Sequence, residues 1–143
     1  MPDPRNIKSL KKKKGKGSQH LKPPDRDTPP DKLQYVSFSF RHLQLSYHIA
    51  DCDNCDKIAL LERMAKLCCL TWYQVYSAER HGFGTETIRR SSIRPTLPSV
   101  VTPETTIIAF RFSGLKPMVG FRTREIFQVL FLDHDRTVYD HGN

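Results

Sequence analysis

The sequence predicts an α+β fold, in which an antiparallel β-sheet of four or five strands carries two helices on one face. Apolar and polar residues alternate along 35–41 and through most of 105–141, and a strand sends successive side chains to opposite faces. Between these stretches the apolar residues follow the spacing of helices. The predicted order is strand, helix, helix, long loop and then a meander of three or four strands, with the helices covering the apolar face of the sheet.

Residues 1–34 differ in composition from the rest of the 143-residue chain. They hold six of the ten prolines and few aliphatic residues, so they cannot bury enough apolar surface to offset the entropy of ordering. We predict a disordered basic tail over 1–34 and one domain over 35–143. The tail carries ten Lys or Arg against four Asp, which places +6 of the net charge of +8 outside the domain. A solubilising leader has this composition, and so does a segment that attracts polyanions through Lys11, Lys12, Lys13, Lys14 and Lys16.

The sequence indicates neither export nor a membrane. The basic N-terminal stretch is not followed by an apolar run of the length that a secretory signal needs, and no window approaches the roughly eighteen apolar residues of a membrane span. The cysteines occur without a leader peptide, which favours free thiols and a cytoplasmic location. They are Cys52, Cys55, Cys68 and Cys69.

Residues 35–41 (YVSFSFR) predict the first strand, with Val36, Phe38 and Phe40 pointing inward. A polar turn follows at 50–54, and the spacing then becomes helical. Either Asn54 or Asp56 can cap the start of this first helix. Its apolar residues recur three and four positions apart, at Leu60, Leu61, Met64, Leu67 and Cys68.

A second helix is predicted over 72–80. Thr71 and Gln74 have the spacing of a capping box, and glycines at 82 and 84 end the helix. Its apolar residues at helical spacing are Trp72, Val75 and Tyr76. Residues 81–104, with three prolines, are predicted to be a long loop, and loops of this length in compact domains often carry function.

The last part of the chain predicts strands joined by hairpin turns at 114–116, 123–125 and 133–135. Leu130 and Leu132 alternate onto the polar face, so either the long loop covers that edge or the strand is buried on both sides. The apolar face is expected to hold Ile108, Phe110, Phe112, Val119, Phe121, Phe127, Val129, Phe131 and Val138. The opposite face is expected to be open to solvent and to carry Arg111, Arg122, Arg124, Tyr139 and His141.

Function is expected on this open face because its side chains suit phosphate chemistry. Arg offers phosphate a planar fork, whereas Lys acts as a point charge. His titrates near neutral pH, so His141 and its neighbour Tyr139 are candidates for acid–base catalysis. The predicted catalytic residues are Arg111, Arg122, Arg124, Tyr139 and His141, and the predicted nucleic-acid contacts are Arg41, Arg89, Arg90 and the tail lysines. The alternative is that the arginines only keep an exposed sheet soluble.

The cysteines leave a zinc site open as a further alternative. Cys52 and Cys55 form one CxxC pair, and the fullest ligand set would add His48 and Cys68. The second CxxC pair of common zinc sites is absent. Cys68 and Cys69 are adjacent, and adjacent helical side chains point about 100° apart, so the two cannot readily share an ion. Cys68 also fits the apolar helix face as a small core residue. We therefore predict no metal and no other cofactor.

Three segments resemble a functionally uncharacterised family of small bacterial and phage-borne proteins. They are FSFRHL at 38–43, LLERMAKLCCLT at 60–71 and GFRTREIFQVLFLDHDRTVYDH at 120–141, and their shared motifs are mainly structural. The order β-α-α-β-β-β is also similar to that of RelE/ParE-type toxins of toxin–antitoxin systems, which cut messenger RNA or poison gyrase. A RelE-like fold implies an open sheet face on which basic, His and Tyr side chains activate a ribose 2′-OH without a metal. By this similarity Arg122 would hold the phosphate, with Arg111 or Arg124 beside it.

Two functions follow as expectations. The first is a RelE-like, metal-independent toxin-type protein that cleaves RNA or inhibits translation, with RNA or the ribosome as target and a small protein antitoxin as partner. The second is a non-enzymatic accessory module of a phage or mobile element that binds nucleic acid or protein. An RNA-cleaving enzyme needs groups that move protons near neutral pH and cations aimed at the developing charge, whereas a binding module needs only the cations.

Overall fold

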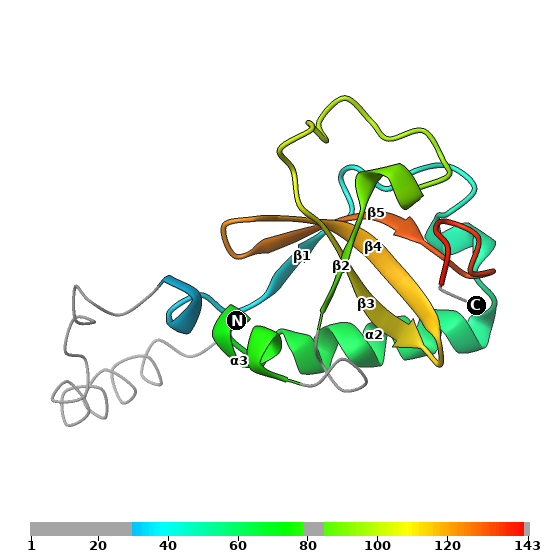
Figure 1. Cartoon of the computed structure of the whole chain (residues 1–143). Coiled ribbons are helices and arrows are strands. Elements are labelled where there is room, and N and C mark those ends of the chain that lie inside the picture. The colour runs from blue at the N-terminus through cyan, green and yellow to red at the C-terminus, as the bar shows by residue number, and fades with distance from the viewer. Residues whose placement is uncertain (1–29, 79–84, 142–143) are drawn as a thin grey trace, which may run out of the picture.

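The computed structural model describes residues 30–78 and 85–141, in which a five-stranded sheet lies between two helices and a long connecting segment (Figure 1). The α+β class and the two helices confirm the predicted fold class. The strands stand side by side in the order β1-β5-β4-β3-β2. Their bounds are β1 (Ser37–Ser39), β2 (Glu86–Ile88), β3 (Ile107–Ser113), β4 (Lys116–Thr123) and β5 (Ile126–Leu132). The helices are α2 (Asn54–Leu67) and α3 (Trp72–Ser77), and short 3-10 turns are η2 (Pro30–Lys32), η3 (Ile49–Asp51) and η4 (Arg90–Ser92).

One strand pair departs from the predicted antiparallel sheet. β1 runs parallel to β5, with Phe38 opposite Phe127, whereas the other three pairs are antiparallel. A parallel pair needs a long connection, and here both helices and the whole meander separate the two strands in the chain. The alternation at 35–41 predicts the strand correctly but carries no information on which edge of the sheet it joins.

Two elements near the ends of the sheet were predicted incorrectly. The long loop over 81–104 contains β2, which pairs with β3, and the turn η4. A three-residue strand is too short to show a period, so alternation could not reveal it. The residues 137–141 form no strand; Tyr139 makes a single bridge to Ile93. Helix α3 ends at Ser77 rather than at residue 80, and the glycines at 82 and 84 lie outside the described residues.

Local side-chain hydrogen bonds fix the starts of both helices. The side chain of Asp53 accepts a hydrogen bond from the Asp56 backbone N–H at 2.7 Å, so Asp53 is the N-cap in place of the predicted Asn54 or Asp56. At α3 the predicted capping box is confirmed. The Thr71 N–H donates to Gln74 Oε1 (2.9 Å) and the Gln74 N–H to Thr71 Oγ1 (3.3 Å).

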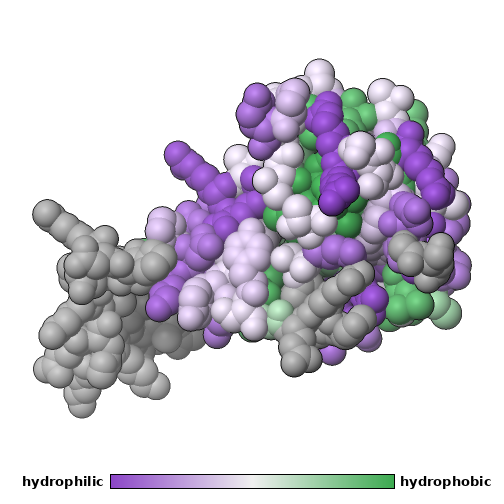
Figure 2. Space-filling model, viewed as in Figure 1, coloured by the Kyte–Doolittle hydropathy of each residue, from purple (hydrophilic) through white to green (hydrophobic). Residues whose placement is uncertain are grey.

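The sheet is buried on both faces, which overturns the prediction of an open face. Helices α2 and α3 cover one face, and the segment from β2 to β3 arches over the other (Figure 1). The helix-side core contains Val36, Cys52, Leu60, Leu67, Trp72, Val75, Ile108, Phe110, Phe112, Met118, Phe127, Val129 and Leu132. The loop-side core contains Ile88, Val101, Ile107, Ala109, Val119, Phe121, Leu130, Phe131, Val138 and Tyr139. Figure 2 shows hydrophilic and intermediate residues intermixed on the visible face, with hydrophobic residues in separate patches.

Strand register decides which residues share a face. Phe110 pairs with Met118 and Ala109 with Val119, so Val119 belongs to the loop-side core and not with Phe110 as predicted. Phe121 lies with Val119 for the same reason. A bulge then changes the phase of β5, because Val119 pairs with Phe131 and Gly120 with Val129. The extra residue is Leu130, which explains why it breaks the alternation: the strand is buried on both sides, and the long segment covers it.

Helix α2 presents a narrower apolar stripe than its sequence predicts. Leu60 and Leu67 are buried, but Leu61 is 67% exposed and Cys68 is exposed at the helix end. Cys68 is therefore not the core residue that its spacing suggested. A helix at the edge of a domain buries only the residues that face the sheet, so neighbouring positions at similar spacing remain in solvent.

Candidate functional site

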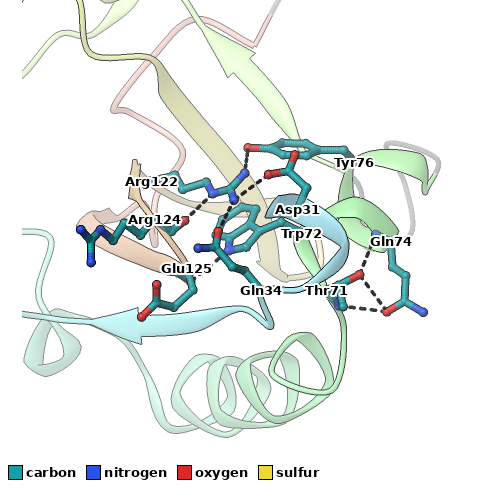
Figure 3. Close-up of polar contacts among 9 residues, drawn as sticks. All are labelled: Asp31, Gln34, Thr71, Trp72, Gln74, Tyr76, Arg122, Arg124 and Glu125. Carbon is teal, nitrogen blue, oxygen red and sulfur yellow. Dashed lines mark hydrogen bonds and ion pairs between the residues drawn. The ribbon is translucent and has the colours of Figure 1, made fainter. Parts of the chain in front are cut away.

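Arg122 is a structural residue of the helix-side face (Figure 3). Its side chain is 18% exposed, and its guanidinium stacks over the Trp72 ring at 4.5 Å. The same group donates to Gln34 Oε1 (3.0 Å) and pairs with Asp31 (2.8 Å). Burial opposes its charge, yet the hydrogen bonds to Asp31 and Tyr76 raise the pKa of Arg122 above its ordinary value. The guanidinium is thus largely buried and held by protein groups, so Arg122 is not the exposed side chain that alternation predicts.

This cluster ties three distant parts of the chain together. Trp72 donates its indole N–H to the Glu125 carbonyl (2.9 Å), and Arg122 Nε donates to the Arg124 carbonyl, so α3 and the β4–β5 turn meet at one point. Arg124 occupies the turn with φ +55, and its side chain points away from the guanidinium of Arg122 in Figure 3. Residues 30–34, which composition assigns to the tail, supply Asp31 and Gln34 to the same cluster.

Three of the five predicted catalytic residues do come together, on the opposite side of the sheet. Arg111, Tyr139 and His141 line a small polar cavity of about 60 Å³ beside β3. The Tyr139 and His141 rings lie 4.2 Å apart between centroids, inclined by 36°. The other lining residues are Glu86, Ala109, Phe110, Leu115, Pro117 and Arg136. We call this the polar cavity.

Sequence reasoning missed Glu86 and Arg136, which complete the polar cavity. The Tyr139 hydroxyl donates to Glu86 Oε2 at 3.3 Å. Arg136 has φ +58, and its Nε is buried with no hydrogen-bond partner among the described residues. Buried donors are nearly always paired, so this nitrogen marks a place for an acceptor. The only sequence signal was the polar turn of residues 133–136, and Glu86 had none because it stood in a predicted loop.

A buried carboxylate anchors the C-terminal segment beside the polar cavity. Asp133 is fully buried and accepts from the backbone N–H groups of Thr137 (2.7 Å) and Val138 (3.1 Å). Burial raises the pKa of Asp133 above its ordinary value of 3.8, although these two hydrogen bonds act in the opposite direction. Its Oδ2 lies 3.7 Å from His141 Nε2, which is longer than a hydrogen bond. Asp133 therefore fixes the turn that carries Arg136, Tyr139 and His141.

Two shallower recesses adjoin the polar cavity and share residues with it. The first holds Arg94 beside Arg136 and His141 and has a volume of about 200 Å³. The second, of about 150 Å³, is lined by Glu86, Thr87, Ile88, Arg89, Ser92, Tyr139 and Asp140. Arg89 therefore lies near the cavity. Arg90 instead donates to the Thr102 carbonyl (2.9 Å), where it holds the long segment together.

Of the remaining predicted nucleic-acid contacts, the structure describes Arg41 alone, and it lies away from the polar cavity. Arg41 is exposed and lies two residues after β1, at the far edge of the sheet. The lysines Lys11, Lys12, Lys13, Lys14 and Lys16 lie outside the described residues.

The residues of the zinc alternative do not form a site. Within 30–78 and 85–141 no group of three or more His, Cys, Asp or Glu is placed to hold a metal ion. Cys52 is buried and donates to the His48 carbonyl at 3.7 Å, and burial raises the pKa of its thiol. Cys55 and Cys68 are exposed near opposite ends of α2. A structural zinc site needs four converging ligands, which this arrangement does not provide.

Comparison with known proteins adds no relative. No protein-family model, no curated protein and no solved structure matches the chain. The similarity to RelE-type toxins therefore stays a hypothesis. None of the helices in the described part of the chain is long and apolar enough to cross a membrane.

Proposed function

We propose that this protein is a toxin-type, RNA-directed protein that holds a phosphate group of single-stranded RNA in the polar cavity. One observation carries the proposal. Arg111 and Arg136 line the same small cavity with His141, and the buried Nε of Arg136 has no acceptor among the described residues. A guanidinium fork is the side chain best shaped for phosphate oxygens.

The size of the polar cavity suits one phosphate group. A cavity needs about 10–15 Å³ to hold a single water. At about 60 Å³ this one has room for a tetrahedral oxyanion but not for a nucleotide. The two adjoining recesses, which contain Arg94 and Arg89, are open enough to receive the neighbouring nucleotides of an extended strand. Single-stranded RNA fits this layout because its bases can be splayed apart around a bound phosphate.

Chain-wide charge favours the same class of partner. The net charge is +8, and +6 of it belongs to residues 1–34. Lysine-rich segments add salt-dependent attraction to any polyanion. The arginines of the cavity instead present planar groups that match the positions of phosphate oxygens. RNA and the ribosome are the polyanions that a translation-inhibiting toxin would meet, and a small protein antitoxin would be its regulator.

The test combines expression and binding. Induced wild-type protein should stop growth and protein synthesis, and the variants Arg111→Ala and Arg136→Ala should restore both. Purified protein should bind a fluorescein-labelled single-stranded oligoribonucleotide, and each variant should weaken binding about tenfold or more, the loss expected for one charge-assisted hydrogen bond. Lys66→Ala is the matched control, because it removes one exposed charge on α2 across the sheet from the cavity. Equal losses in Lys66→Ala and in the cavity variants would refute the site.

A specific observation favours the second candidate, an accessory module that binds a protein. Ile58 and Leu61 of α2 are 59% and 67% exposed and lie one helical turn apart. Two adjoining aliphatic side chains on a helix form a small apolar surface that a protein partner could cover. Wild-type expression without any effect on growth, together with no binding of RNA, would favour this module over the toxin.

A further inference from the structure

We infer that three exposed tyrosines around helix α3 form a stacking surface for the unpaired bases of a single-stranded nucleic acid. They are Tyr35, Tyr73 and Tyr76, and we call them the tyrosine surface. The inference goes beyond the proposed function, because the tyrosine surface shares none of the described residues that line the polar cavity. It also takes a different part of the ligand, the bases instead of a phosphate.

The three rings are in solvent, although aromatic side chains stabilise a protein mainly by being buried. Tyr35 is 59% exposed, Tyr73 is 48% exposed and Tyr76 is 44% exposed. Tyr73 and Tyr76 stand three residues apart in α3, so their side chains are neighbours on the helix surface. Tyr35 forms a backbone bridge to Thr71, the N-cap of α3, which brings it to the start of the same helix.

Two of the rings carry a cation beside them. The Nζ of Lys32 lies 4.6 Å from the centroid of the Tyr73 ring. The guanidinium of Arg122 lies 5.7 Å from the centroid of the Tyr76 ring, between this ring and the buried Trp72 (Figure 3). Cation–π contacts of this kind hold the rings in place. A base that stacks on either ring brings its flanking phosphates close to the same cations.

Charge near the tyrosine surface favours a nucleic acid over a protein as its occupant. The chain enters the described structure at Pro30 in the turn η2, which packs against α3. The preceding residues 1–29 hold nine Lys or Arg against three Asp, so a net charge of +6 joins the domain beside the tyrosines. Asp31, the carboxylate of η2, is neutralised by its ion pair with Arg122 at 2.8 Å. Proteins that bind single strands combine aromatic rings for the bases with cations for the backbone in this way.

The class of ligand follows from the faces of the bases. Every base has a π face, so stacking tolerates any sequence, and it does not involve the ribose 2′-OH. A duplex keeps its bases stacked on one another and offers the rings only its backbone. The protein should therefore bind single-stranded RNA and single-stranded DNA more tightly than a duplex of the same length.

The experiment compares two fluorescein-labelled strands of equal length with the full-length protein. One is oligouridylate, and the other has the same backbone with abasic sugars, so it keeps the phosphates and lacks the bases. Tyr35→Ala and Tyr73→Ala should each weaken the binding of oligouridylate about fivefold or more, the lower end of what one base–aromatic stack contributes. Both variants should bind the abasic strand within about twofold of the wild type, because they remove no charge.

Two controls separate loss of the ring from other effects of substitution. Tyr73→Phe keeps the ring and should bind oligouridylate within about twofold of the wild type. Leu45→Ala removes another exposed apolar side chain, one that is 87% exposed, and should leave both affinities unchanged. Circular dichroism melts check that each variant is folded. The salt dependence of binding should keep its slope in the tyrosine variants and flatten when residues 1–29 are removed.

The outcomes distinguish this inference from the proposed function. Wild-type affinity for oligouridylate in Tyr35→Ala and Tyr73→Ala would overturn the tyrosine surface and leave these rings to a protein partner. Equal losses for the oligouridylate and the abasic strand would also overturn it, because stacking would then contribute nothing. Weaker binding in Arg136→Ala alone would support the polar cavity and refute the tyrosine surface, and weaker binding in the tyrosine variants alone would do the reverse. No binding of either strand by the wild type would overturn both.

Discussion

Replacing Arg122 by Ala should destabilise the protein strongly, although alternation places this residue on a solvent-exposed face. The change removes a guanidinium that covers the ring of the fully buried Trp72 and bonds to Gln34. It also removes the ion pair with Asp31. The three attachments join the segment before β1, helix α3 and the β4–β5 turn, so their loss loosens all three at once (Figure 3).

The magnitude can be worked from these contacts. The cation–π contact with a buried Trp contributes about 1–2 kcal/mol, and a hydrogen bond from a charged group contributes about 1.5–3 kcal/mol. The ion pair adds at most about 1 kcal/mol, because the Asp31 side chain is 39% exposed and solvent screens it. All three share one guanidinium and are not additive, so the expected loss in free energy of unfolding is about 2–4 kcal/mol.

Urea denaturation at 25 °C measures this loss through the fluorescence of Trp72, the single tryptophan of the chain. Arg122→Lys should recover less than half of the loss, because an ammonium group keeps the charge but lacks the planar fork that stacks and branches. Lys66→Ala, which removes an exposed charge from α2, should stay within about 0.5 kcal/mol of the wild type. A loss below about 0.5 kcal/mol in Arg122→Ala would refute the structural role and return this residue to the list of surface cations.

Three other predictions test the fold. Gly120→Ala should lower the free energy of unfolding, measured in urea, by about 1–3 kcal/mol or more. The reason is that a Cβ atom at residue 120 would lie 2.0 Å from a backbone oxygen of β5. Wild-type stability in this variant would contradict the close approach of β4 and β5 at Gly120. Burial disfavours the charge of Asp56, but hydrogen bonds from Lys116 and Ser113 lower its pKa below the ordinary 3.8. The stability that the ionised carboxylate contributes is therefore present above about pH 4 and is lost as the pH falls through its folded-state pKa. Asp56→Asn should accordingly make stability fall less steeply at acid pH. An unchanged fall would show that Asp56 does not contribute to the acid dependence of stability. Removing residues 1–29 should leave the melting temperature unchanged and weaken the salt-dependent binding of RNA. Removing residues 1–34 should also lower the melting temperature, because it deletes the contacts of Asp31 and Gln34 with Arg122. Equal melting temperatures for the two deletions would show that these contacts do not contribute to stability.

Much of the local structure could be predicted from the sequence because it depends on neighbouring residues. The strands of the meander and their hairpin turns lie where alternation places them, within 105–132. The capping box of Thr71 and Gln74 needs only a spacing of three residues, and it forms as predicted. Helix α2 follows from its apolar spacing, although its cap is Asp53 and neither of the predicted residues, Asn54 or Asp56.

The candidate site was predicted only in part. Three residues chosen for their chemistry do lie together in the structure: Arg111, Tyr139 and His141. They do not share an open strand face, which was the reason for expecting them together. The residues 137–141 form no strand, and it is Asp133 that holds this segment through the backbone of Thr137 and Val138. The pattern of alternation alone could not supply Glu86 or Arg136.

The sequence by itself determined where most strands and helices lie, the capping box of α3 and the types of side chain available for phosphate chemistry. Tertiary structure decided on which face of the sheet each side chain lies. Alternation defines two sides of each strand but not which side of one strand matches which side of the next, and that match is set by register. The pairing of Phe110 with Met118 and the bulge at Leu130 moved Phe121 and Phe131 to the loop side, and Arg122 went to the helix side, away from Arg111. Register arises from contacts between segments far apart in the chain, so the site at its edge becomes visible only in the folded molecule.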